Sequence, residues 1–151
     1  RLILAAAIAA VPLAAIAQDN DPIKQAIEAR HGFYQMLAIN MGTLAGTAKG
    51  EIPFDQTAVT AAASNIEALS KYSTLPALFV PGSGPADGKE TEALPAVWDK
   101  PEDFAAKYTA FQTAAAGAGE AVAGGQDALG PVLQKLGGAC KACHDDFRKE
   151  D

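Results

Sequence analysis

Apolar residues recur at alternating gaps of three and four positions along four separate stretches of the chain. Side chains at this spacing share one face of an α-helix, and the heptad-like stripe that they form is typical of helices packed at shallow angles in a bundle. No stretch shows the alternation of apolar and polar residues that a half-buried strand needs. The pattern therefore predicts an all-α, four-helix bundle.

The bounds of these helices are set by capping residues and glycines. We expect Asp21, Asp55 and Pro101 to start the first three helices, because Asp accepts hydrogen bonds from free N–H groups and Pro fits the first turn. Gly124 and Gly125 are expected to separate the third helix from the fourth. The stripes are Ile23, Ile27, Arg30, Tyr34, Leu37, Met41, Leu44 and Ala48; Val59, Ala62, Ile66 and Leu69; Phe104, Tyr108, Phe111, Ala115, Ala118 and Val122; and Leu129, Leu133, Leu136, Cys140, Cys143 and Phe147.

Residues 73–100 interrupt this helical pattern with a segment rich in Gly, Pro and Asp, which predicts a long loop. Connections of this length in a compact domain are usually functional or disordered, and a plain linker across one end of the bundle is the alternative. Trp98 near the end of the segment suggests that part of it packs against the helices.

The N-terminal stretch has the character of a targeting segment. After Arg1, residues 2–17 carry no charge and end in Ala15-Ile16-Ala17. A basic residue, an apolar stretch and a small-x-small ending are typical of a secretory signal peptide. An uncleaved membrane anchor is the alternative, but the stretch is shorter than the ~20 residues that a spanning helix needs. We expect residues 1–17 to be cleaved, which leaves residues 18–151 as one domain with no membrane span.

Charge and composition exclude several classes of function. The net charge is −6 and there is no basic stripe, so the sequence does not predict a nucleic-acid-binding protein. It shows no catalytic nucleophile and no paired acid and base, so an enzyme is not expected. Arg30 stands out because it occupies a position in the first stripe where an apolar residue belongs. A buried guanidinium is costly unless it meets an anion, either a carboxylate of another helix or an acidic group of a ligand.

The sequence CKACH at residues 140–144 holds both cysteines and one of the two histidines. The pattern C-x-x-C-H is the attachment motif for c-type haem. On a helix, Cys140 and Cys143 share a face and can add to the two vinyl groups of one porphyrin. The ring of His144 can then offer a neutral nitrogen to the iron.

Other uses of the two sulfurs fit the sequence less well. A disulfide between cysteines three positions apart would close a tiny loop and stabilise the fold little. A thioredoxin-like dithiol lies near a βαβ unit, and the chain shows no strands. A structural zinc site needs four ligands, for which only His31 and carboxylates remain.

Three segments resemble the cytochrome c′ family. They are the C-terminal GGACKACHDDFRKED, the segment EARHGFYQMLAINMGTLAGTAKGEIPFD with the turn after the first helix, and LPAVW before the third helix. The position of the haem motif near the C-terminus is distinctive, since most c-type cytochromes carry it near the N-terminus. The resemblance covers residues 18–151 and implies a left-handed antiparallel four-helix bundle in the bacterial periplasm, with one haem c bound covalently near one end.

The resemblance also implies roles for individual residues. Cys140 and Cys143 would carry the thioethers, and His144 would be the fifth iron ligand. Arg30 and His31 fall where the family places residues that contact the haem and its propionates, so a haem carboxylate would be the anion that Arg30 needs.

Two further positions match the family. Glu92, just before LPAVW, matches another haem-contacting position. Arg148 matches the proximal Arg beside the ligand histidine, and its place four residues after His144 predicts that both lie on one helical face.

The sixth coordination position of the iron separates two functions. In low-spin relatives a Met of the first helix binds iron, whereas cytochromes c′ hold an apolar or aromatic residue there and the iron stays five-coordinate. Tyr34, one turn after Arg30, matches that position, which predicts binding of nitric oxide or carbon monoxide together with electron transfer to an unknown donor or acceptor. The alternative is a low-spin electron shuttle with Met36 or Met41 as sixth ligand.

The first helix is also apolar outside its stripe, at Phe33, Met36 and Ile39. A helix with apolar residues on two faces usually buries the second face against a partner. The sequence therefore predicts a homodimer that associates through the first helix.

Overall fold

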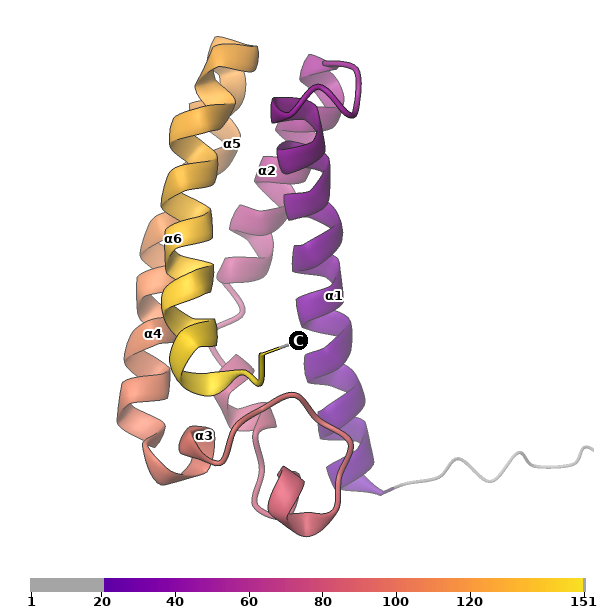
Figure 1. The fold of residues 1–151 in the computed structure, drawn as a ribbon, viewed down its shortest axis with the longest axis vertical. Coiled ribbons are helices and arrows are strands. Elements are labelled where there is room, and N and C mark those ends of the chain that lie inside the picture. Colours follow the sequence, from indigo (N-terminus) through magenta and orange to yellow (C-terminus); the bar gives the residue numbers. More distant parts are fainter. Residues whose placement is uncertain (1–20, 151) are drawn as a thin grey trace, which may run out of the picture.

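Four long helices lie side by side and define the fold (Figure 1). They are α1 (Pro22–Ala48), α2 (Gln56–Ser70), α4 (Pro101–Ala115) and α6 (Leu129–Phe147). The computed structural model describes residues 21–150, so the expected signal peptide at residues 1–17 lies outside the described part. Successive long helices run in opposite directions, which confirms the predicted antiparallel four-helix bundle. Within residues 21–150, no helix combines the length and apolar character that crossing a membrane requires.

The capping residues act as the sequence predicts. The Asp21 carboxylate accepts a hydrogen bond from the N–H of Ile23 at 2.9 Å. Asp55 accepts from the N–H groups of Thr57 and Ala58 at 2.7 and 3.1 Å. Each cap satisfies backbone donors that have no partner within the helix, which is worth about 1 kcal/mol.

The third predicted helix is not continuous, contrary to the sequence-based prediction that it extends to Val122. It ends at Ala115, and α5 (Ala118–Ala121) follows after a break at Gly117. Gly117 has a φ of 73°, a left-handed conformation that other residues rarely adopt. Two short 3₁₀ turns, η3 (Val122–Gly124) and η4 (Gln126–Ala128), then lead to α6. Val122 stays buried because the break redirects the chain without lifting it from the core.

The core lies along the length of the bundle, where α1 packs on α2 and α6, and α4 packs on α6 and α2. One residue corrects the expected pattern: Phe33, assigned to an outer face, is buried and packs against Tyr34 and Tyr72. The residues of this main cluster are Phe33, Leu44, Val59, Ala62, Ala63, Ile66, Leu75, Tyr108, Phe111, Ala115, Ala118, Val122, Leu129, Val132 and Leu136.

The connection between α2 and α4 is a folded segment that closes one end of the bundle (Figure 1). It contains η1 (Leu75–Leu78), η2 (Pro85–Asp87) and the single-turn α3 (Ala96–Asp99). The indole N–H of Trp98 donates to the Val80 carbonyl at 3.2 Å, and the Tyr108 hydroxyl donates to the Tyr72 carbonyl at 2.7 Å. These bonds hold the segment together and fasten its start to α4, so it is more than a plain linker.

The break at Gly117 gives a first test. Gly117→Ala should destabilise the protein by about 1 kcal/mol, since a Cβ is disfavoured at this φ although it would meet no neighbouring atom within 4 Å. Gly138→Ala is the matched control, because Gly138 is exposed within α6 and a Cβ there also meets nothing within 4 Å. That change should stabilise by roughly 1 kcal/mol. Denaturant unfolding of the two variants measures both, and effects of the same sign would contradict this account.

Candidate functional site

The last turns of α6 present the CKACH residues at the end of the bundle that the loop closes (Figure 1). Cys140 and Cys143 are free, half-buried thiols one turn apart. Cys143 packs against a small cluster formed by Val97, Phe104 and Phe147, whereas His144 is exposed. Because the two cysteines and the histidine all come from the last turns of one helix, helical geometry sets the relative positions of their backbones.

The environment of the thiols keeps them protonated. Burial raises the pKa of Cys140, and burial raises the pKa of Cys143 to about 11. The two thiols are therefore mostly protonated at neutral pH in the protein without a cofactor. Within residues 21–150, no three His, Cys, Asp or Glu side chains gather where they could hold a metal ion. The described residues therefore provide no ligand set for the structural zinc alternative.

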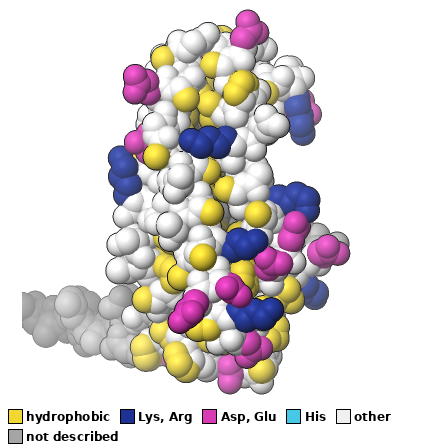
Figure 2. Space-filling view, turned by 90° about the vertical axis from the view of Figure 1, so that its left-hand side faces the viewer, with side chains coloured by type: hydrophobic (Ala, Val, Ile, Leu, Met, Phe, Trp, Pro, Cys, Tyr) yellow, Lys and Arg dark blue, Asp and Glu magenta, His cyan; other side chains and the backbone are white. Residues whose placement is uncertain are grey.

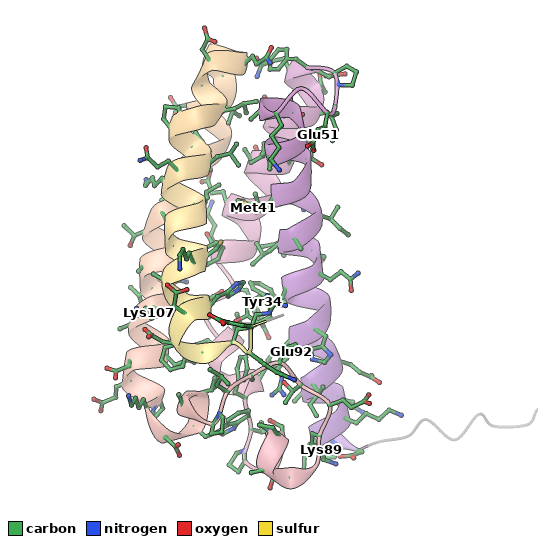
Figure 3. The ribbon with its side chains drawn as sticks, viewed as in Figure 1. Tyr34, Met41, Glu51, Lys89, Glu92 and Lys107 are labelled. Carbon is green, nitrogen blue, oxygen red and sulfur yellow. The ribbon has the colours of Figure 1, made fainter. Side chains whose placement is uncertain are left out.

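Tyr34 faces the two thiols from the opposite helix. Figure 3 shows it between α1 and the last turns of α6. Burial is the main cause that raises the pKa of Tyr34, and the nearby Cys143 and Cys140 raise it further. Its ring also meets that of Phe33 edge to face, with 5.5 Å between centroids. The phenol is therefore neutral at physiological pH and is held in place by a buried neighbour.

The two methionines lie elsewhere. Met36 is exposed and lines an outer groove between α1 and α2. It is two positions after Tyr34, which places it about 200° around the helix, on the other side. Met41 packs against the main core cluster further along α1, as Figure 3 shows. Seven residues at ~1.5 Å each put it about 10 Å along the axis from Tyr34.

Arg30 is buried, as predicted, but its partners are neutral. It is 1% exposed. Its guanidinium donates to the Ser83 hydroxyl and carbonyl at 2.8 and 2.7 Å, to the Thr91 hydroxyl at 3.1 Å and to the Leu78 carbonyl at 3.5 Å. It also stacks over the Phe79 ring, 4.6 Å from the centroid. Among the described residues no carboxylate of another helix pairs with it, so the structure does not support that alternative. Its contact with a haem carboxylate stays a prediction.

The loop that Arg30 organises is joined to the end of α6. The Leu94 N–H donates to the Phe147 carbonyl at 2.9 Å, and the Lys149 N–H donates to the Glu92 carbonyl at 2.7 Å. The backbone of Arg148 pairs with that of Ala93 in an isolated antiparallel bridge. Glu92 is thereby placed beside the attachment helix, near its last turn.

Arg148 corrects one sequence-based argument. The helix ends at Phe147, and Arg148 already has an extended backbone, so it cannot share a helical face with His144. Its N–H still donates to the His144 carbonyl at 3.0 Å, which keeps the two residues adjacent.

His31 lies on α1 beside Arg30 with its side chain in solvent, and the described residues offer it no hydrogen bond.

Sequence reasoning missed three residues that hold this end of the bundle: Ser83, Thr91 and Lys107. The first two bind Arg30, and the Lys107 ammonium donates to the Ala142 carbonyl at 2.9 Å, inside the CKACH turn. Ser83 and Thr91 lie in the loop, where periodicity carries no signal. Lys107 sits beside the apolar stripe of α4, and its position between Phe104 and Tyr108 is the only hint that it faces α6.

These side chains fit a covalently bound haem. Two half-buried thiols on one face of α6, a histidine beside them and an aromatic residue facing them from α1 are the groups that such a cofactor needs. The contact of α1 with α6 is also much less extensive than its contact with α2. The side chains that face each other across α1 and α6, namely Tyr34, Cys140 and Cys143, are only partly buried by the protein itself.

Comparison with known proteins agrees with this geometry. The Cytochrome C′ family model matches residues 25–148. A curated relative, cytochrome c′ of Cereibacter sphaeroides, is 42% identical over 148 residues, covering 98% of this chain and 97% of the relative. The solved structure of cytochrome c′ from Rhodobacter sphaeroides is 40% identical with a TM-score of 0.79, covering 85% of this chain and 98% of that one.

A further solved structure is a nitric oxide complex of a variant of cytochrome c prime from Alcaligenes xylosoxidans. It is 28% identical with a TM-score of 0.71, and the match covers 89% of this chain and all of that one. The helical bundle, the attachment motif at the end of its last helix and these matches lead to one conclusion. The chain is a haem c protein that belongs to the cytochrome c′ family.

Proposed function

We propose that this chain is a periplasmic haem protein whose iron has His144 as its one protein ligand and binds small uncharged gases, nitric oxide and carbon monoxide, at the sixth position. It also exchanges electrons with a donor or acceptor. Binding and electron transfer, and not substrate turnover, are its proposed activities. The observation that carries this proposal is that Tyr34, and neither methionine, faces the two thiols.

The side chain opposite the thiols decides the coordination number. A neutral phenol is a poor ligand for ferrous iron, and burial holds the pKa of Tyr34 well above its usual value. Met36 is on the far side of α1, and Met41 is about 10 Å further along it. Neither reaches an iron centred near Cys140, Cys143 and His144. A relative that has been solved as a nitric oxide complex supports the proposed ligand.

Each residue around the proposed haem has its own role. Haem supplies reversible one-electron change at iron and a vacant coordination position for gases. We propose that Cys140 and Cys143 hold it through thioethers and that His144 binds the iron. Tyr34 and the partly buried Leu37 and Met41 form an apolar wall on the α1 side. Such a wall penalises anions, which lose hydration there, more than neutral diatomic gases.

Arg30, Glu92 and Arg148 are proposed to act at the edge of the cofactor. Arg30 fixes the loop from residue 78 to residue 91, and Glu92 and Arg148 lie where this loop pairs with the end of α6. His31 is proposed to reach the haem edge from the solvent side. Its exposure leaves its imidazole free of buried contacts that would prevent this.

We further propose that a second copy of the chain covers the outer groove between α1 and α2. The groove has a volume of about 660 Å³. Its lining is uncharged: Ala29, Phe33, Met36, Asn40, Asn65, Ala68, Leu69, Tyr72 and Leu78. In a chain of net charge −6, an uncharged and mostly apolar face lets two copies meet without repulsion between like charges.

Covalent attachment is tested by mass. Intact protein from a host with haem-attachment machinery should carry the added mass of one haem, because both thiols can form thioethers. Cys140→Ala and Cys143→Ala should each reduce or abolish stable haem incorporation. Wild-type protein with the mass of the bare processed chain would contradict the proposal.

The role of Tyr34 is tested by ligand kinetics. Tyr34→Ala should speed carbon monoxide binding to the ferrous protein roughly ten-fold, the effect of lowering a barrier by ~1.4 kcal/mol, because no ring needs to move. Tyr34→Phe keeps the ring and should stay close to wild type. The phenol should remain unionised, and the ferric spectrum free of phenolate ligation, up to at least pH 10. A low-spin wild-type spectrum that becomes high-spin in Met36→Leu or Met41→Leu would establish the electron-shuttle alternative instead.

Dimer formation is tested at Met36, which is 48% exposed in the groove. Met36→Glu places a charge on the proposed interface and should shift sedimentation from dimer to monomer at micromolar concentration, with no change in the haem spectrum. Phe54→Glu is the control, since Phe54 is an exposed apolar residue in the turn between α1 and α2, outside the groove. A wild type that sediments only as monomer would exclude this interface.

A further inference from the structure

Lys107 connects α4 to the turn that carries the haem motif. Its ammonium donates to the Ala142 carbonyl at 2.9 Å and forms an ion pair with the Asp146 carboxylate at 2.8 Å. Ala142 lies between the two cysteines, and Asp146 comes two residues after His144. Figure 3 shows Lys107 beside the last turns of α6, on the opposite side from Tyr34. One side chain therefore holds the segment around His144 at both of its ends.

This segment needs such support because it is a helix terminus. α6 ends at Phe147, so His144 lies in its last turn, where the carbonyls lack partners within the helix. Terminal turns open most readily, and a cation near a helix C-terminus is stabilising. The bonds from Leu94 and Lys149 fasten the chain after His144 to the loop. Lys107 provides the corresponding attachment to α4.

A second lysine on the same turn provides a contrast. Lys141 also pairs with an aspartate, Asp145, at 2.6 Å, but both belong to α6 and the Lys141 side chain is 75% exposed. This pair cannot tie α6 to another element. The Lys107 side chain is 34% exposed and its pair crosses between two helices. Charges of both signs gather over the lower part of the α4 and α6 face (Figure 2). Both lysines therefore have a similar mixture of charges around them, and they differ in which elements their ion pairs connect.

We propose that Lys107 is a positioning residue for the axial histidine: by binding the Ala142 carbonyl and the Asp146 carboxylate, it fixes the last turn of α6 and hence the orientation of the His144 ring toward the iron. This inference rests on the proposed role of His144 as iron ligand. The bonds of Lys107 to this turn are to the Ala142 carbonyl and the Asp146 carboxylate, so its proposed action on His144 runs through the attachment turn.

The test compares holoprotein of wild type, Lys107→Met, Lys107→Arg and Lys141→Met. Lys107→Met and Lys141→Met each remove one positive charge close to the same turn. A difference between the two variants therefore reports the loss of the contact between α4 and α6 and not the loss of the charge. Amide hydrogen exchange of residues 144–148 should become about ten-fold faster in Lys107→Met, the effect of losing a charge-assisted bond. The iron–histidine stretching band of the ferrous protein should shift or broaden. Lys107→Arg, which keeps the charge and the donors, should restore both readouts.

Lys141→Met should match wild type in both measurements. Equal behaviour of Lys107→Met and Lys141→Met would overturn the inference. A wild type without an iron–histidine band would refute His144 as the ligand, and the exchange rates would still decide separately whether Lys107 holds the turn.

Discussion

A buried guanidinium is the constraint on which the functional end of this bundle depends. Removing the Arg30 charge from water costs several kcal/mol unless its donors are satisfied, so the chain around it must supply acceptors. It does so from the loop, through the Ser83 hydroxyl and carbonyl and the Thr91 hydroxyl, with the Phe79 ring against the guanidinium plane. A Gly- and Pro-rich segment that has little helix or strand propensity thereby acquires one conformation. The position of Arg30 on α1 then dictates where the loop lies relative to the bundle.

The ordered loop in turn defines the end of α6. Its backbone donates to Phe147 and accepts from Lys149, while Lys107 binds the other side of the same turn. The attachment motif is thus held by a loop and a helix that are distant from it in sequence. This arrangement suits a site in which a planar group is bound from one helix. Helical geometry places the backbones of Cys140, Cys143 and His144 relative to one another, but the whole turn must also be placed correctly against Tyr34 on α1.

The sequence predicts the parts of this arrangement that rest on local physics. Helix starts at Asp21 and Asp55 follow from capping, and the stripes of α2 and α6 follow from periodicity, so these predictions agree with the structure. The break at Gly117 was missed because a stripe continues through Ala118 and Val122 even though the backbone does not. The site residues that local patterns reveal are those of CKACH. The partners of Arg30 and the contact of Lys107 depend on how distant segments meet, and periodicity within one element contains no information about that. Phe33 shows the same limit, since its burial is decided by Tyr72 and Tyr108 on other elements.

The proposed function depends on which residue of α1 lies opposite Cys140 and Cys143. Arg30, Tyr34, Leu37 and Met41 share a face of the helix, but only one of them can stand opposite the thiols, because each further turn moves a side chain ~5.4 Å along the axis. Arg30 is committed to the loop, and Met41 lies too far along to approach the same point. The loop, α4 and the backbone pairing fix the height of α6, and this makes Tyr34 the facing residue. We therefore propose that neither methionine of α1 supplies a sixth ligand, although both lie close to Tyr34 in sequence. If Tyr34 has the role proposed here, the interactions that fix the height of α6 relative to α1 matter for the coordination of the iron as much as the identity of the facing residue does.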